Sequence, residues 1–152
     1  DLRDVASDIV QAVKSVKHLR KNVLRYTVRD EGAVTELYDG LRTEIARILL
    51  EIRKLERADP EDRSALWLDH EHAQIEEDAR TTTRRIDRFI RAGALKPHAA
   101  TSFLNDSSYA YDAMRQLIKA ARSYYIERDR SMAELEHLLA LDDDEFGAGR
   151  AG

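Results

Sequence analysis

The sequence predicts an all-α fold, an antiparallel up-and-down bundle of four long helices followed by a short C-terminal helix. Apolar residues recur in alternating steps of three and four on four successive segments, which keeps one stripe of each helix facing its neighbours. Hydrophobic residues make up 43% of the 152-residue chain and charged residues 36%, the balance that amphipathic helices require. Almost nothing in the sequence predicts strands.

Each helix is predicted from one seam of apolar positions. The first two seams are Leu2, Val5, Ile9, Ala12, Val16, Leu19, Val23 and Tyr26, and then Val34, Tyr38, Leu41, Ile45, Ile48, Ile52 and Leu55. The third and fourth are Leu68, His72, Ile75, Ala79, Thr82, Ile86 and Phe89, and then Phe103, Ser107, Ala110, Met114, Leu117, Ala121 and Tyr124.

The ends of the first three helices follow from turn and capping residues. The first helix is expected over 2–28, before Gly32 allows a turn, and the second helix continues to about Arg57. The run 59–62, Asp-Pro-Glu-Asp, predicts the start of the third helix, with a capping Asp, proline in the first turn and acids at the positive end of the dipole. Gly93 is the expected left-handed cap at its end.

The fourth helix is expected to begin between 98 and 102. Because no Gly or Pro follows until Gly147, a bend is predicted near 127–131, followed by a short helix carrying Leu135, Leu138, Leu139 and Leu141. Residues 1–141 are then one helical bundle domain, and residues 142–152 are a flexible tail rich in acids and glycine.

Composition excludes several classes of function. The chain has no cysteine, which rules out disulfides, thiolate metal sites and thiol catalysis, and its net charge of −4 gives no general attraction for nucleic acid. No apolar run approaches the ~20 residues that a membrane-spanning helix needs. No nucleophile–base pair or phosphate-binding glycine loop is recognisable, so a non-enzymatic role is expected. The chain begins without methionine, which suggests a piece of a longer protein.

The first helix carries a basic face, defined as Lys14, Lys17, His18, Lys21 and Arg25, and no acid interrupts it between 14 and 29. One interpretation is ion pairing with the acid-rich second helix. The other is contact with an anion, either phosphate or the headgroups of anionic lipids.

Asp106 is the most informative charged residue, because its spacing from Phe103 and Ala110 places it on or beside the buried stripe of the fourth helix. A buried carboxylate costs several kcal/mol unless it is paired. The expected basic partners are Lys17 or Arg20 from the first helix, or Arg84 or Arg85 from the third. Such an ion pair would fix the helix register; the alternative is a ligand- or ion-sensing pocket that includes Asn105.

A metal site is a further candidate. Asp69, His72 and Glu76 share a face of the third helix, and the acid-x-x-His spacing recurs at Glu134 and His137. Paired motifs of this kind hold divalent or ferric ions in carboxylate-bridged di-metal bundles. Such a site needs inward carboxylates from other helices, and the first seam offers none after Asp8. A hydrogen-bonded histidine at the edge of the core is the simpler interpretation of His72.

Two segments resemble a known family. Residues 8–23, DIVQAVKSVKHLRKNV, are similar to the opening helix of the cytoplasmic C-terminal domain of bacterial Na+/phosphate cotransporters. Residues 100–111, ATSFLNDSSYAY, resemble the Thr-Ser-x-x-Asn-Asp-Ser segment near the end of that domain. The domain is related to PhoU, the all-helical regulator of phosphate uptake.

The resemblance implies a regulatory domain attached to a membrane transporter domain, on the cytoplasmic side of the cell membrane, where it takes part in phosphate transport or phosphate signalling. PhoU relatives bind metal clusters through Glu/Asp-x-x-x-Asp motifs, but Glu36 and Asp39 are one residue too close for that pattern, so no cofactor is expected. A homodimer and contact with phosphate or anionic lipid are compatible with this role. The alternatives are a di-metal bundle and a homo-oligomerising scaffold.

Overall fold

Every regular element in residues 2–28 and 32–148, the part of the chain that the computed structural model describes, is helical; side chains are described for 2–26 and 32–138. The long helices are α1 (Leu2–Val28), α2 (Ala33–Arg57), α3 (Ala65–Arg91), α4 (Pro97–Ala121) and α5 (Arg128–Ala148). A 3-10 turn, Pro60–Asp62, precedes α3, and a π-helical segment, Arg122–Glu127, joins α4 to α5. The all-α prediction is therefore confirmed for this part of the chain.

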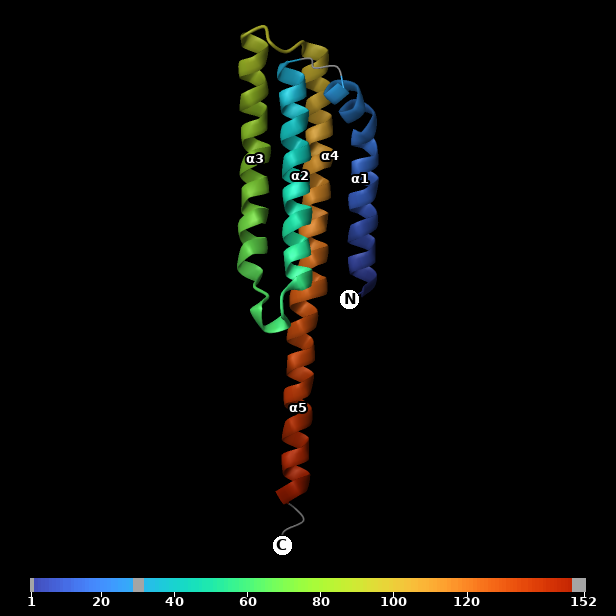
Figure 1. The fold of residues 1–152 in the computed structure, drawn as a ribbon, viewed down its shortest axis with the longest axis vertical. Coiled ribbons are helices and arrows are strands. Elements are labelled where there is room, and N and C mark those ends of the chain that lie inside the picture. The colour runs from blue at the N-terminus through green and yellow to red at the C-terminus, as the bar shows by residue number, and fades with distance from the viewer. Residues whose placement is uncertain (1, 29–31, 149–152) are drawn as a thin grey trace.

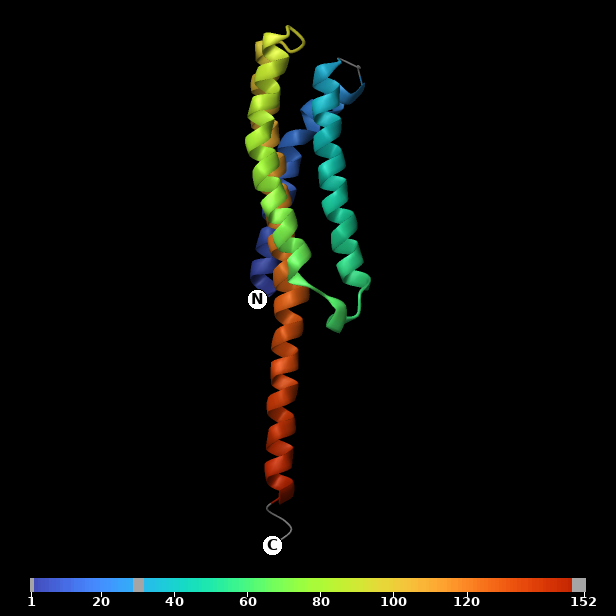
Figure 2. The same cartoon turned by 90° about the vertical axis from the view of Figure 1, so that its left-hand side faces the viewer.

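The helices α1 to α4 lie side by side along the long axis, and α5 extends α4 beyond the end of the other helices (Figures 1 and 2). The α3–α4 connection lies at one end of the bundle, and the α2–α3 connection lies at the end from which α5 projects (Figure 1). No helix in the described ranges is both long enough and apolar enough to cross a bilayer.

The helix α4 is the central element, because α1, α2 and α3 all pack against it. Small side chains on α4 make this possible, since helices approach more closely where the contact is built from small residues. The buried small residues of α4 are Ala99, Ala100, Ser107, Ala110, Ala113, Ala120 and Ala121. The fully buried large side chains around them are Tyr26, Tyr38, Ile48, Leu68, Ile75, Phe103 and Met114.

The seam of α1 is only half buried, which differs from the prediction. Val5, Ala12, Leu19 and Tyr26 are buried, whereas Leu2, Ile9 and Val16 are 66%, 45% and 42% exposed. The reason is that α1 packs mainly on α4 and makes few contacts with α2. One neighbour covers one side of the seam, and the other side is left open to solvent.

The start of α3 also differs from the prediction. Asp59 precedes only the 3-10 turn and makes no capping hydrogen bond with its side chain. Ser64 is the N-cap of α3, and its hydroxyl accepts a hydrogen bond from the Leu66 amide at 3.2 Å. Between the two, Arg63 adopts an extended backbone and donates to the carbonyl oxygen of Leu55, which separates the turn from the helix. The predicted positions of Gly32 and Gly93 are confirmed, with φ of 64° and 69°.

The predicted bend at 127–131 is wrong. The chain continues through the π-helical segment into α5 without a break, and α5 is long rather than short (Figure 1). A π-helical turn accommodates one extra residue within a continuing helix, so it changes the facing of side chains without a bend. The helix includes 142–148, which were predicted to be part of a flexible tail; the last four residues, 149–152, lie outside the described part of the chain.

Candidate functional site

Asp106 lies at the contact between α1, α2 and α4, and only 5% of its surface is exposed, as its place in the seam predicts. Its Oδ2 atom accepts two hydrogen bonds. The hydroxyl of Tyr38 on α2 donates at 2.6 Å, and the Nδ2 of Asn22 on α1 donates at 2.8 Å. This carboxylate therefore joins three helices at one atom, and we call Asn22, Tyr38 and Asp106 the buried polar triad.

Aromatic rings hold the Tyr38 side chain in place. Tyr38 is fully buried, stacks on Tyr26 with ring centroids 5.2 Å apart, and meets Phe103 edge to face at 5.0 Å. Burial first, and then the hydrogen bond to Asp106, raise the pKa of Tyr38 far above its ordinary value. The phenol therefore stays protonated and acts as a hydrogen-bond donor to the carboxylate.

The prediction that Asp106 pairs with a basic side chain is wrong. Among the described residues, Asp106 makes no ion pair, and its partners are the neutral Tyr38 and Asn22. The four basic candidates lie elsewhere. Lys17 and Arg20 are exposed beside a groove between α1 and α2, Arg85 pairs with Glu36, and Arg84 lies 4.0 Å from Glu77. Asn105, next in the chain, is exposed on α4 and is not part of the triad.

Two signals in the sequence pointed to the missed partners. Tyr38 is a member of the second seam, so its hydroxyl is carried into the core and needs an acceptor there. Asn22 lies between Leu19 and Tyr26 of the first seam, within the segment 8–23 that resembles the transporter family. Asp106 lies within the second such segment. The two segments thus face one another in the structure, and His18 also stacks on Tyr109 with ring centroids 4.6 Å apart.

The basic face of α1 is not neutralised by α2. Lys14, Lys17, Lys21 and Arg25 are exposed, and within the described part of the chain none of them forms an ion pair. Arg25 only lies over the ring of Tyr26, at 5.3 Å from its centroid. The predicted pairing of the first helix with the acids of the second is therefore not observed.

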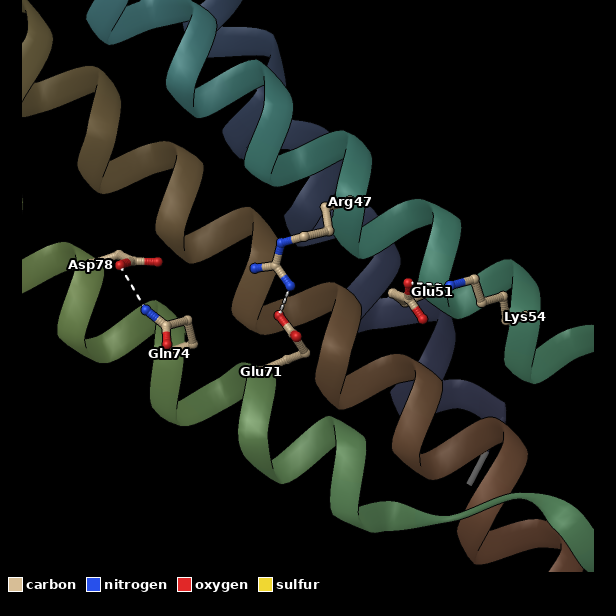
Figure 3. Close-up of polar contacts among 6 residues, drawn as sticks. All are labelled: Arg47, Glu51, Lys54, Glu71, Gln74 and Asp78. Atoms are coloured by element: carbon tan, nitrogen blue, oxygen red, sulfur yellow. Dashed lines mark hydrogen bonds and ion pairs between the residues drawn. The ribbon is translucent and has the colours of Figure 1, made fainter.

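Three acids of α2 form ion pairs, either within α2 or with α3, and none of these pairs involves α1. Glu36 pairs with Arg85, Asp39 with Arg42 at 2.9 Å, and Glu51 with Lys54. Figure 3 shows side chains of α2 that pair within α2 or with α3 and not with α1. Arg47 reaches from α2 to the buried Glu71 of α3, while Glu51 bonds to Lys54 on its own helix. The positive charge of α1 is thus available for a partner outside the bundle.

One further ion pair ties α1 to α4. Lys119 lies 2.9 Å from Oδ1 of Asp8, a carboxylate near the start of α1 that is 7% exposed. The second oxygen, Oδ2, is buried without a hydrogen-bond partner. An unsatisfied buried oxygen costs free energy, which offsets part of what this ion pair contributes to stability.

The predicted metal ligands are not brought together. Asp69 pairs with Arg122, and Nε of Arg115 donates to Glu76, which lowers the pKa of the Glu76 carboxyl. His72 is exposed, so its predicted place in the third seam is wrong. Across the described ranges, no group of three or more His, Asp or Glu side chains could hold a metal ion. Each carboxylate that the di-metal hypothesis needs is occupied by an arginine.

Comparisons with known proteins add no relative: no family model matches the chain, and no curated protein or solved structure is significantly similar to it. Two features of the structure indicate what the chain does. One is the buried polar triad, which joins three helices. The other is the unpaired basic face of α1.

Proposed function

We propose that this chain is a non-enzymatic regulatory domain of the kind found below bacterial Na+/phosphate cotransporters, a PhoU-like, antiparallel up-and-down bundle that takes part in phosphate transport or phosphate signalling. It acts at the cytoplasmic side of the membrane, attached to a transporter domain. The two segments that resemble this family pack against each other as α1 and α4, and each contributes a member of the buried polar triad.

The observation that carries the proposal is the unpaired basic face of α1. Four exposed cations occupy one side of a helix that has no acid from 9 to 25, and among the described residues no acid of α2 pairs with them. Exposed Lys and Arg near an anionic surface contribute ~1 kcal/mol each. We infer that this face is turned toward phosphate groups, either lipid headgroups or inorganic phosphate.

Co-sedimentation with vesicles tests this inference. The full chain is expected to bind vesicles that contain phosphatidylglycerol and to bind phosphatidylcholine vesicles much more weakly. Lys14→Gln combined with Lys21→Gln removes two charges that contribute ~1 kcal/mol each, which weakens binding by about 30-fold. Both side chains are exposed, so the fold is expected to stay intact.

A matched pair on other helices controls for net charge. Arg53→Gln on α2 together with Arg88→Gln on α3 removes the same total charge from exposed positions that make no ion pair among the described residues. This variant should bind as the wild type does. Equal loss in both variants would contradict a specific role for α1, and titration of the chain with inorganic phosphate, followed by calorimetry, would separate free phosphate from headgroups.

The attachment to a transporter has its own test. The coding sequence upstream of Asp1 is expected to encode apolar segments of ~20 residues in the same reading frame. A frame that opens at this position without such segments would refute the attachment. The vesicle experiment would still report on the basic face.

A further inference from the structure

The helix α5 carries an apolar stripe with no cover in the described part of the chain. Met132, Leu135 and Leu138 recur every three residues and are 50%, 54% and 62% exposed. The helix projects from the bundle and is tied to it at its base, where Arg63 pairs with Asp129 at 2.8 Å (Figures 1 and 2). A projecting helix is only marginally stable in water, and a line of exposed apolar side chains on it indicates a partner.

A complementary surface lies between α1 and α2. A groove of about 1210 Å³ separates them and is lined by apolar side chains, among them Val13, Val16, Leu24 and Leu49. These four are 63%, 42%, 55% and 49% exposed. The groove exists because α1 packs on α4 rather than on α2, which leaves the outer side of the α1 seam open. We call this the α1–α2 groove.

The charges of the groove and of α5 are opposite. Lys17 and Arg20 line the groove, and neither forms an ion pair among the described residues. The sequence of α5 contains six acids and no Lys or Arg from 131 to 148. An acidic helix with an apolar stripe fits an apolar groove with a basic edge, which is the helix-in-groove mode of recognition.

We propose that α5 of one copy lies along the open side of α1 of a second copy and runs from there into the α1–α2 groove, in a dimer with two-fold symmetry. A two-fold axis makes this contact twice, so each copy contributes both a helix and a groove to the interface. The inference does not depend on the transport proposal. Of the basic face it uses only Lys17, which lines the groove, and it leaves Lys14, Lys21 and Arg25 for phosphate groups.

The position of α5 along the bundle supports this occupant. Leu2 and Val5 at the start of α1 line a common cavity with Glu127 and Arg128, so α1 begins at the level where α5 leaves. In a two-fold dimer centred at that level, the α5 of the partner runs along α1 in the same direction. Both helices rise ~1.5 Å per residue, so positions 128 + n and 2 + n lie at about the same height.

This register places apolar residues beside apolar residues and acids beside bases. Leu135 and Leu138 lie at the height of residues 9 and 12, where the exposed Ile9 and Val13 form an apolar strip on α1 that leads into the groove. The acids at 142–145 fall at the height of 16–19, next to Lys17 and Arg20. The apolar stripe therefore meets apolar residues, and the acidic end of the helix meets the basic edge of the groove.

Light scattering of the full chain after size exclusion provides the first test. A mass twice that of the 17.4-kDa chain is expected at micromolar concentration. Leu135→Asp combined with Leu138→Asp is expected to give a monomer, whereas Ile90→Asp, an exposed apolar position on α3 at the far end of the bundle, should leave the dimer intact. A monomeric wild type overturns the proposal, including the case in which α5 binds vesicles instead.

Charge reversal tests the assigned contact. Lys17→Glu combined with Arg20→Glu is expected to weaken the dimer about tenfold or more. Adding Asp142→Lys and Asp143→Lys to the same chain should restore most of the lost affinity. Both variants change exposed or terminal positions, and circular dichroism verifies that each one folds. Absence of this rescue overturns the assigned contact.

The chain has no cysteine, so single cysteines can report the geometry. Mixing a Val13→Cys chain with a Leu138→Cys chain under mild oxidation is expected to give a covalent product of two chains. The control pair, Leu50→Cys with Leu138→Cys, should not, because Leu50 faces away from the groove on α2. In a chain that carries both Val13→Cys and Leu138→Cys, a disulfide formed only within one molecule would overturn the assignment to a second copy.

Discussion

Removal of the Tyr38 hydroxyl is the sharpest test of the buried polar triad. Tyr38→Phe keeps the ring that stacks on Tyr26 and meets Phe103, and it deletes only the donor that lies 2.6 Å from Oδ2 of Asp106. Hydrogen bonds to charged groups contribute ~1.5–3 kcal/mol. Because Tyr38 is fully buried, no water replaces the lost donor, so the cost is expected in the upper part of that range, at about 2–3 kcal/mol.

Urea denaturation followed by far-ultraviolet circular dichroism measures this loss. With a slope of about 2 kcal/mol per molar, the midpoint is expected to fall by about 1 M or slightly more, with the slope unchanged. Tyr109→Phe is the matched control. Tyr109 lies on the same helix as Asp106, is 38% exposed, and stacks on His18 through its ring rather than its hydroxyl.

A double-mutant cycle with Asp106→Asn isolates the pair. Because both changes affect one hydrogen bond, the double variant should lose less than the sum of the single variants, with a coupling of about 1–2 kcal/mol. A Tyr38→Phe variant within about 0.5 kcal/mol of the wild type, or additive single changes, would refute the role that the structure gives to the triad.

Three smaller predictions follow from the ends of helices and from one half-buried acid. Ser64→Ala should lower the free energy of unfolding by about 1 kcal/mol, whereas Asp59→Ala should change it little, because only Ser64 caps α3 through its side chain. Glu44→Gln should raise stability at neutral pH, because burial raises the pKa of Glu44 and so disfavours its charged form in the fold. Arg63→Ala should lower protection of α5 amides in hydrogen exchange, because Arg63 holds Asp129 at the base of that helix.

The sign of the Glu44 effect sets its pH dependence. A raised folded pKa means that the folded chain binds the proton more tightly, so stability is lost as pH rises from the unfolded value toward the folded one. The advantage of Glu44→Gln is therefore present near neutral pH and disappears below the unfolded pKa of about 4.3. Melting curves at pH 7 and at a pH below the unfolded pKa measure the difference, and Glu56→Gln, an exposed acid on α2 without an ion pair among the described residues, is the comparison. An advantage that persists at low pH would contradict the electrostatic cause.

The helices could be predicted from the sequence because their signals are local. Apolar spacing indicates where a helix runs, and Gly32 and Gly93 indicate where two of the connections lie, with the positive φ angles that glycine adopts easily. The start of α3 could not be predicted in this way. Asp59 and Pro60 are a good local start signal, but the long-range bonds of Arg63 to Leu55 and Asp129 hold the intervening chain extended.

The site could be predicted only in part. The burial of Asp106 followed from its place in the fourth seam, but its partners did not, because spacing does not distinguish a basic partner from a neutral donor. Tyr38 and Asn22 satisfy the carboxylate without bringing a second charge into the core. This spares the desolvation cost of a cation such as Lys17 or Arg20, and both of these side chains remain in water.

The same limit explains the two apolar surfaces that the structure leaves open. An apolar seam predicts that a helix has neighbours, but it does not say how many of them belong to the same chain. In α1 the neighbour α4 covers Val5 and Ala12 and leaves Ile9 exposed; in α5 the seam continues through Leu135 beyond the end of the bundle. Both strips have the spacing of a buried helix face. Since burial of such a face is the main source of helix stability, a second copy that covers both is the arrangement under which every seam in this sequence has a physical reason.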